Sequence, residues 1–175
     1  MRTLPLFAGI LATVASPVAA GPENVAYPEG YPSAFVRYAT VDRPDRDPPI
    51  VRFLYVNPEA LAAAQAGEPL PYGTVLVMED HLAERDDQGQ PATFANGRFV
   101  PTTEVTNVFV QEKREGWGEE YPPDLRNGEW EYARFMADGS VTPDAKFEGC
   151  FECHKGVEAQ DFNFTFSPFV SEIKN

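Results

Sequence analysis

The sequence predicts a mainly β fold, a β-rich α+β arrangement in which a large antiparallel sheet is accompanied by a few short helices. Two segments, 105–112 and 129–136, alternate in side-chain character as strands do. Turns are marked by three Asn-Gly or Asp-Gly pairs that favour hairpins, at 96–97, 127–128 and 138–139. Seventeen prolines argue against a helical bundle, because proline interrupts helices.

The remaining elements are expected in a simple order along the chain. Asn57 is expected to cap a helix that begins at Pro58, and Gly67 is expected to end it after the alanine-rich stretch. Strands are expected over 51–56, 73–79, 105–112, 129–136 and 162–166, and a short helix over 147–154. The stretch 34–41 is expected to form either a strand or a short helix. Loops are expected over 21–32, 42–49 and 80–91.

Residues 1–20 have the layout of a secretory signal. Arg2 supplies a positive start, an apolar run extends from Leu4 to Val14, and Val18-Ala19-Ala20 offers the small residues that a signal peptidase needs. The apolar run is shorter than the roughly 20 residues that span a bilayer, and no later stretch is apolar enough to cross one. We therefore expect cleavage after Ala20, one mature domain over 21–175, and a periplasmic protein without a membrane span.

The chain is strongly acidic, with a formal net charge of −13. Nucleic acid is an unsuitable partner, because phosphate binding requires a basic surface. The acidic surface either serves solvation alone or favours a basic redox partner protein.

The two cysteines lie in one motif, Cys150-Phe151-Glu152-Cys153-His154, which fits the C-x-x-C-H pattern of c-type haem attachment. One helical turn places both thiols where each can add to a haem vinyl group, and His154 is then the proximal iron ligand. The sequence thus predicts one covalent haem c. A disulfide or redox dithiol lacks the expected thioredoxin-like pattern, and a zinc site lacks ligands, since only His81 and carboxylates remain.

The position of the motif narrows the class of cytochrome. Only 21 residues follow His154, and none of them is Met or His. An electron-transfer cytochrome c with a methionine far downstream of the motif is therefore excluded. Cytochrome c′ also has a C-terminal motif, but it is a four-helix bundle, which the strand and turn patterns contradict.

From Tyr27 to Phe166 the chain resembles the cytochrome P-460 family, which includes the cytochromes c′-β. The resemblance rests on the order of six segments, at 27–31, 55–60, 71–75, 108–118, 150–154 and 161–162. It implies a homodimer, a large antiparallel sheet, and a five-coordinate haem c that binds small nitrogen ligands such as nitric oxide or hydroxylamine.

The resemblance also implies roles for single residues. Members of the family that oxidise hydroxylamine carry a lysine cross-linked to the haem; that lysine corresponds to a position near Met78, where methionine cannot form the nitrogen link. Lys113 is the nearest alternative, but we expect a solvated lysine at the end of a strand. Glu158, four residues after His154, matches a family carboxylate that relays protons, and it is otherwise an exposed acid.

Four further expectations concern the surroundings of the iron. Met78 is either a weak distal ligand or a core residue. Arg37 either pairs with a distal ligand or a haem propionate, or lies on the surface. His81 is expected to be exposed. Four aromatic side chains are expected either to line the haem pocket or to belong to the ordinary core: Phe35, Phe53, Tyr55 and Trp130.

Three functions follow from these residues. The first is a haem protein that binds nitric oxide or a related ligand at an open distal site. The second is an enzyme that oxidises hydroxylamine. The third is an electron carrier whose sixth iron position is closed by Met78 or another side chain.

Overall fold

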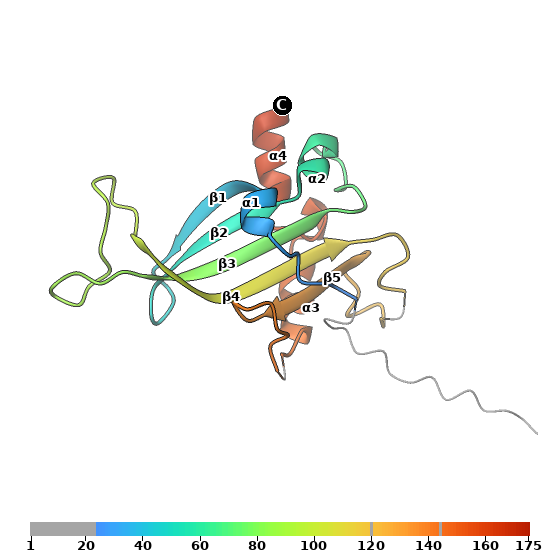
Figure 1. Ribbon diagram of the computed structural model, residues 1–175. Coiled ribbons are helices and arrows are strands. Elements are labelled where there is room, and N and C mark those ends of the chain that lie inside the picture. Colours follow the sequence, from blue (N-terminus) through green and yellow to red (C-terminus); the bar gives the residue numbers. More distant parts are fainter. Residues whose placement is uncertain (1–23, 120, 144) are drawn as a thin grey trace, which may run out of the picture.

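The computed structural model describes residues 24–119, 121–143 and 145–175 (Figure 1). The predicted signal sequence, 1–20, lies outside the described residues. No helix in the described ranges is long and apolar enough to cross a membrane.

Five antiparallel strands form one sheet in which each strand pairs with the next along the chain (Figure 1). This arrangement confirms the predicted fold class. Its order, in which no strand crosses over another, requires only local connections. The strands are β1 (Val36–Arg43), β2 (Ile50–Val56), β3 (Val75–Ala83), β4 (Pro101–Lys113) and β5 (Trp130–Phe135).

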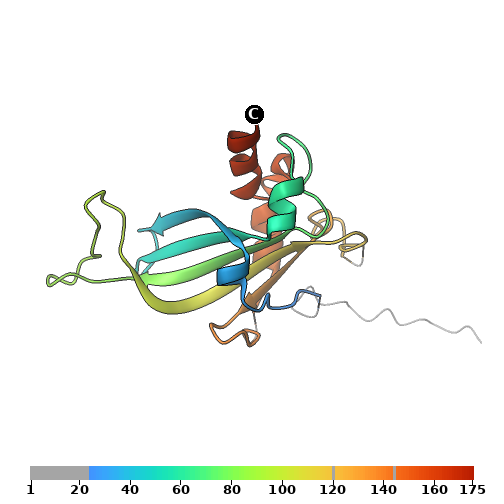
Figure 2. The same ribbon diagram turned by 45° about the horizontal axis from the view of Figure 1, so that its top comes forward.

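Short helices complete the fold, and three of them pack on one face of the sheet (Figure 2). We call this the helical face; its central row across the strands consists of Val56, Leu76, Gln111 and Tyr132. The helices are α1 (Tyr31–Ala34), α2 (Pro58–Ala63), α3 (Glu148–Lys155) and α4 (Phe166–Lys174), with a 3₁₀ turn, η1, at Glu158–Gln160.

The two faces of the sheet carry separate apolar clusters, as the alternation of side chains along a strand requires. On the helical face, α3 contributes Phe151 and α4 contributes Phe166 to a cluster that includes Trp130. On the opposite face, Tyr31 of α1 packs against Tyr55 and its neighbours. Each face is therefore closed by different parts of the chain.

The predicted helix after Asn57 is shorter than expected, because it ends at Ala63 and not at Gly67. The Asn57 side chain makes no capping hydrogen bond. Its amide instead donates to the Gly73 carbonyl at 3.2 Å, and its Oδ1 accepts from the Val75 amide at 2.9 Å. Asn57 thus ties the start of α2 to the start of β3.

The predicted last strand over 162–166 is wrong. Residues 162–165 form a turn, and α4 begins at Phe166. The Asn163 side chain accepts hydrogen bonds from the amides of Thr165 (3.1 Å) and Phe166 (2.5 Å), so it satisfies donors that a new helix leaves unpaired. An asparagine three residues before the first residue of the helix was the local signal in the sequence.

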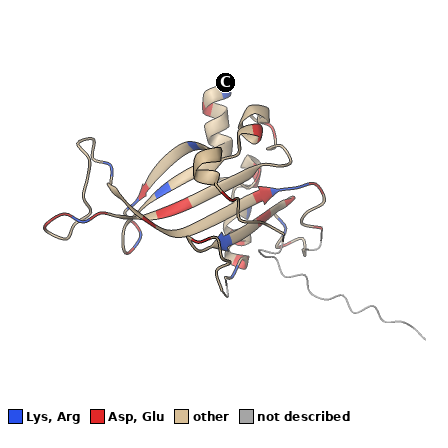
Figure 3. Cartoon of the chain, viewed as in Figure 1, with Lys and Arg blue, Asp and Glu red and all other residues tan. Residues whose placement is uncertain are grey.

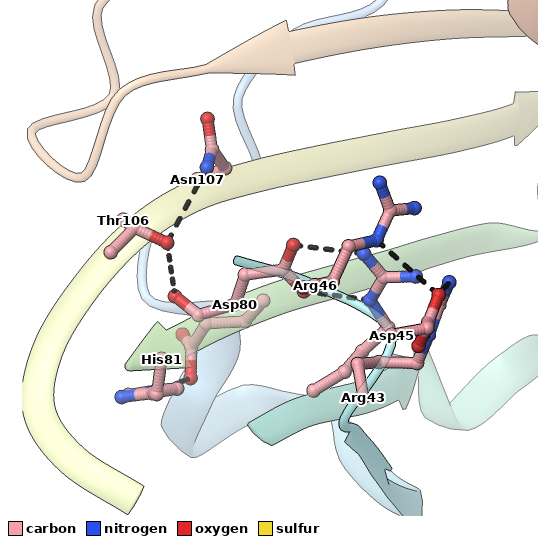
Figure 4. Close-up of polar contacts among 9 residues, drawn as sticks. Arg43, Asp45, Arg46, Asp80, His81, Thr106 and Asn107 are labelled. Atoms are coloured by element: carbon pink, nitrogen blue, oxygen red, sulfur yellow. Dashed lines mark hydrogen bonds and ion pairs between the residues drawn. The ribbon is translucent and has the colours of Figure 1, made fainter. Parts of the chain in front are cut away.

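Strand β3 continues to Ala83, so the predicted loop over 80–91 is wrong in its first four residues. The charged side chains that suggested a loop are paired inside the sheet. Asp80 accepts from Arg52 at 2.7 Å, and the Thr106 hydroxyl donates to the Asp80 carbonyl at 3.1 Å (Figure 4). Strand β1 likewise extends to Arg43, into the region expected to be a loop.

The segment between β3 and β4, residues 84–100, projects from the sheet as a long arm (Figures 1 and 2). Its Asn96-Gly97 pair forms a turn, with Gly97 at φ 80°. Asp138-Gly139 makes a second turn after β5, whereas Asn127-Gly128 lies in the long connection that precedes β5. Two of the three predicted pairs thus reverse the chain between bridged residues, and the third does not.

Candidate functional site

The two cysteines of the C-x-x-C-H motif lie on α3, as predicted. Cys150 is half-buried and Cys153 is exposed, and both are free thiols. Their spacing of three residues puts them on one side of the helix, one turn apart. Burial raises the pKa of the Cys150 thiol, and the neighbouring Cys153 adds to this effect. The pair is therefore presented from a fixed helix with one sulfur open to solvent.

Helix α3 is anchored to the sheet by an aromatic residue between the cysteines. Phe151 is 2% exposed and packs edge-on against Tyr132, with ring centroids 4.8 Å apart. The Asn127 amide donates to the Phe151 carbonyl at 2.9 Å and to the Tyr132 hydroxyl at 3.0 Å. These contacts fix the direction in which the neighbouring motif residues point.

His154 is held by a single backbone acceptor. Its Nδ1 lies 2.7 Å from the Phe162 carbonyl oxygen. A carbonyl can only accept, so Nδ1 carries the proton and Nε2 keeps its lone pair. Burial lowers the pKa of His154, which further favours the neutral ring. The imidazole is therefore prepared to bind a metal through Nε2.

Aromatic rings enclose the His154 imidazole from two sides. The Tyr132 ring lies 4.9 Å from it and the Phe164 ring 5.1 Å, measured between centroids. Tyr132 belongs to β5 and faces α3, so His154 lies over the helical face of the sheet. Neutral imidazole with an oriented Nδ1–H and an aromatic surround is the donor arrangement that a haem iron takes as proximal ligand.

Lys113 is not the solvated lysine that the sequence suggested. It is 7% exposed, and its Nζ donates to Asp161 Oδ2 at 2.8 Å and to the Leu70 carbonyl at 2.9 Å. The prediction failed because the last residue of β4 still faces the helical side of the sheet, where the segment after α3 covers it.

Met78 lies on the same sheet face as His154. It occupies the centre of β3, half-buried, in a row with Leu54 on β2 and Phe109 on β4. This row is adjacent to the central row that contains Tyr132. Both of its predicted roles, distal ligand and core residue, remain compatible with this position.

Arg37 and Glu158 are not brought to the His154 side chain. Arg37 pairs with Tyr55 across β1 and β2 on the opposite face of the sheet, is exposed, and lies 4.5 Å above the Phe53 ring. Glu158 is also exposed, in a surface hollow beside Leu70. The structure therefore favours the surface alternative for both side chains.

The predicted aromatic wall is divided between the two faces. Trp130 is fully buried on the helical face, in the cluster that contains Phe151. The other three side chains pack on the opposite face and so cannot line the same cavity as His154; they are Phe35, Phe53 and Tyr55.

A second polar cluster, on the opposite face, was missed. Glu79 is 5% exposed and accepts from His81 Nε2 at 2.7 Å, from the Tyr55 hydroxyl at 3.3 Å, and from the Tyr31 hydroxyl. His81 is 7% exposed, so its predicted exposure is wrong. Little signal for it was present in the sequence, because Glu79, Asp80 and His81 form an unbroken polar run that is typical of a loop.

A comparison with protein families matches the Cytochrome P460 family model to residues 28–165. The chain belongs to the cytochrome P460 family. The match covers the motif helix, His154 and the Phe162 carbonyl, and this family membership implies a haem cofactor. A search of curated proteins gives no match. The donor set around His154 fits the haem that the family implies.

Proposed function

We propose that this cytochrome P460 family member is an exported, periplasmic protein with one haem c bound covalently through Cys150 and Cys153. His154 is its proximal ligand, and the distal iron position is open to a small nitrogen ligand, nitric oxide or hydroxylamine. The observation that carries the proposal is the Nδ1 contact of His154 with the Phe162 carbonyl, which leaves Nε2 as the ligating atom.

The chain contributes attachment and orientation. Thioether bonds from the two motif cysteines keep the cofactor on an exported protein, while His154 holds the iron on one side. When bound, the haem supplies an iron centre that accepts a ligand and exchanges one electron. The buried Phe151 and its contacts with Tyr132 keep α3 from rotating, so the orientation of the ligating nitrogen is built into the fold.

A partly apolar surface near His154 favours neutral ligands. Leu54, Met78 and Phe109 form a row on the helical face of the sheet. Arg134 of β5 continues this row, with its guanidinium 5.3 Å from the Phe109 ring centroid and its Nε donating to Asn107 Oδ1 at 3.0 Å. The three apolar side chains give no compensation for the desolvation of a charged anion, whereas neutral nitric oxide needs none. A haem attached to α3 would meet this face, and a neutral ligand would bind beside its apolar part without a charged partner.

The residues argue against the hydroxylamine-oxidising alternative. Met78 has no nitrogen for a cross-link, and the Lys113 ammonium is already held by Asp161 and the Leu70 carbonyl. The electron-carrier alternative requires that Met78 or another side chain close the sixth position. Both alternatives have distinct signatures, so the same experiments separate them.

Intact mass of the exported protein is the first test. We expect the chain without residues 1–20 plus the mass of one haem, and no further bond. A Cys150→Ser/Cys153→Ser variant should be exported without covalent haem. A wild-type protein that remains colourless beside a working cytochrome c maturation system would refute the proposal.

Optical spectra then test the distal site. We expect a high-spin ferrous haem that binds carbon monoxide and nitric oxide rapidly. A low-spin ferrous spectrum that carbon monoxide does not change would support the electron carrier, and Met78→Leu should then open the site. A red-shifted Soret band together with an added cross-link mass would support the hydroxylamine oxidase.

The proposal also includes a homodimer and a redox partner protein. Light scattering during size exclusion chromatography should give twice the mass of the haem-bound chain at micromolar concentration. A monomer mass across the accessible concentration range would contradict the dimer, while leaving the haem site intact.

A further inference from the structure

We propose that the Lys113–Asp161 ion pair is a positioning device for His154. It holds the turn whose carbonyl orients the imidazole, and it thereby tunes the strength of the iron–imidazole bond and the reduction potential. This inference rests on the proposed haem attachment and on His154 as the iron ligand. The geometry of the turn and the burial of the ion pair support it independently.

The turn has an unusual backbone. Asp161 and Phe162 are consecutive residues with left-handed backbone angles, φ 53° and 56°. They are the two described residues other than glycine with positive φ. This conformation is unfavourable for an L-residue, so it persists only where other contacts hold it. The Phe162 carbonyl that accepts the hydrogen bond from His154 Nδ1–H belongs to this turn.

Contacts to the Asp161 side chain hold the backbone of the turn in this left-handed conformation. Asp161 Oδ2 accepts from Lys113 Nζ and from the Leu70 amide, each at 2.8 Å. Because Lys113 also donates to the Leu70 carbonyl, three segments of the chain meet at one carboxylate. The side chains of the ion pair are only 9% and 14% exposed, so water does not replace either partner readily.

Strand β4 also contacts the Phe162 carbonyl directly, through Gln111. Gln111 lies two residues before Lys113 and therefore on the same face of the sheet. Its amide donates to the Phe162 oxygen at 3.1 Å, and its own oxygen accepts from the Asn163 amide at 3.0 Å. The Phe162 carbonyl is thus placed by the strand as well as by the ion pair.

The consequence for the iron follows from the hydrogen bond at Nδ1. A short hydrogen bond from Nδ1–H to a fixed acceptor raises the basicity of the imidazole. A more basic imidazole binds the iron more strongly and favours the ferric state. If the turn relaxes, the carbonyl moves from Nδ1 and this effect declines. The ion pair therefore acts on the iron through the backbone of the turn.

A purely structural role is the competing explanation. An ion pair that only connects the segment around Leu70 to the turn after α3 would affect the stability of the protein, but not the ligand field of the iron. The two roles are separated by measuring the iron–imidazole stretching frequency of the ferrous protein by resonance Raman, together with the midpoint potential.

The test uses the haem-bound protein and a double variant, Lys113→Met/Asp161→Asn, which removes one charge of each sign. A matched control is Arg98→Met/Asp42→Asn, which removes a less buried ion pair of similar length, 2.7 Å, between β1 and the arm. We expect the Lys113/Asp161 variant to lower the stretching frequency and to raise the equilibrium constant for reduction at least threefold. The control should leave both quantities at the wild-type values.

If the double variant does not fold, Asp161→Asn alone is the substitute, because asparagine tolerates a left-handed conformation. It should lower the frequency less but in the same direction, with Asp42→Asn as its control. Wild-type frequency in a folded variant overturns the inference, even if stability falls. A wild-type protein that shows no iron–imidazole mode at all contradicts the proposed haem ligation instead, so the two failures are distinguishable.

Discussion

Gly118 shows how the lack of a side chain sets the path of the connection between β4 and β5. The residue has φ 88°, and a Cβ built on it would overlap the Gly128 carbonyl oxygen. Gly116 has a similar φ, 82°, but a Cβ there would meet nothing within 4 Å. Gly116 and Gly118 therefore have different reasons to be glycine.

Substitution of the two glycines separates backbone strain from steric overlap. Gly116→Ala should lower the free energy of unfolding by about 1 kcal/mol, the cost of a left-handed alanine. Gly118→Ala should cost roughly 2–4 kcal/mol, because the neighbouring backbone must move as well. Urea unfolding monitored by tryptophan fluorescence measures both values. Equal losses would show that the close approach to Gly128 carries no cost.

The Glu79–His81 pair predicts a pH dependence of stability. Burial is the largest single influence on the pKa of His81 and lowers it, but the hydrogen bond and charge of Glu79, together with the Thr102 carbonyl and Asp80, outweigh burial and raise the pKa above 6.5. Burial would likewise raise the pKa of Glu79, yet donors from His81 and Tyr31 lower it below 4.5. The stabilisation from His81 is thus complete below pH 6.5 and is lost as the pH rises through its folded-state pKa. That from Glu79 is present above pH 4.5 and is lost as the pH falls.

We expect the contribution of this pair to the urea midpoint to be greatest between pH 4.5 and 6.5 and to decline as the pH rises above 6.5. Glu79→Gln should reduce stability by about 2 kcal/mol near pH 6. It should also flatten the decline at higher pH, because His81 loses the partner that raises its pKa. Glu59→Gln, on exposed α2, is the control. An equally steep decline in Glu79→Gln would exclude this pair as the cause.

At the scale of elements, α4 closes the helical face of the sheet. Phe166 is fully buried between Tyr38 of β1 and Phe169, and Lys174 donates to the Ala64 carbonyl beyond α2. Such contacts join the last helix to elements about one hundred residues earlier in the chain. Most of the stability of a nine-residue helix must come from this packing.

Truncation of α4 side chains tests this dependence. Phe166→Ala should destabilise the protein by roughly 3–5 kcal/mol, because it removes a buried ring and leaves a cavity. Phe169→Ala, at a half-buried site on the same helix, should cost about half as much. Thermal unfolding of the haem-bound protein gives the comparison. Similar losses for the two variants would show that α4 is not anchored mainly through Phe166.

Local sequence patterns predicted the elements that local interactions determine. The sheet strands and the motif helix followed from alternation and from the C-x-x-C-H spacing. Helix α4 was missed although its signal is local, since Asn163 lies three residues before Phe166 and accepts from its amide. The extension of β3 was missed for a long-range reason, because it depends on pairing of Asp80 with Arg52 across the sheet. Lys113 was misjudged for the same reason, since its partner Asp161 lies 48 residues away. Single-sequence patterns carry no information about such partners.

At the scale of the whole molecule, the dominant electrostatic property is excess negative charge. The formal net charge is −13, and acidic side chains are distributed over strands and loops with fewer basic ones among them (Figure 3). The Cys153 end of α3 is exposed, so a haem attached there would exchange electrons through this acidic surface. Long-range attraction should accordingly increase the encounter rate with cationic partners.

The sign of this effect is testable without knowledge of the natural partner. Reduction of the ferric protein by hexaammineruthenium(II), a cation, should slow several-fold as ionic strength rises from about 10 to 150 mM, because the Debye length falls to about 8 Å. Oxidation of the ferrous protein by ferricyanide, an anion, should accelerate over the same range. Stopped-flow absorbance of the haem follows both reactions. The prediction requires that the two rates change in opposite directions with salt. The two reagents thereby control for each other, because a specific effect of the salt on the protein would change both rates alike. If both rates change in the same direction, electron exchange does not pass through the net acidic field, and a basic redox partner loses its physical basis.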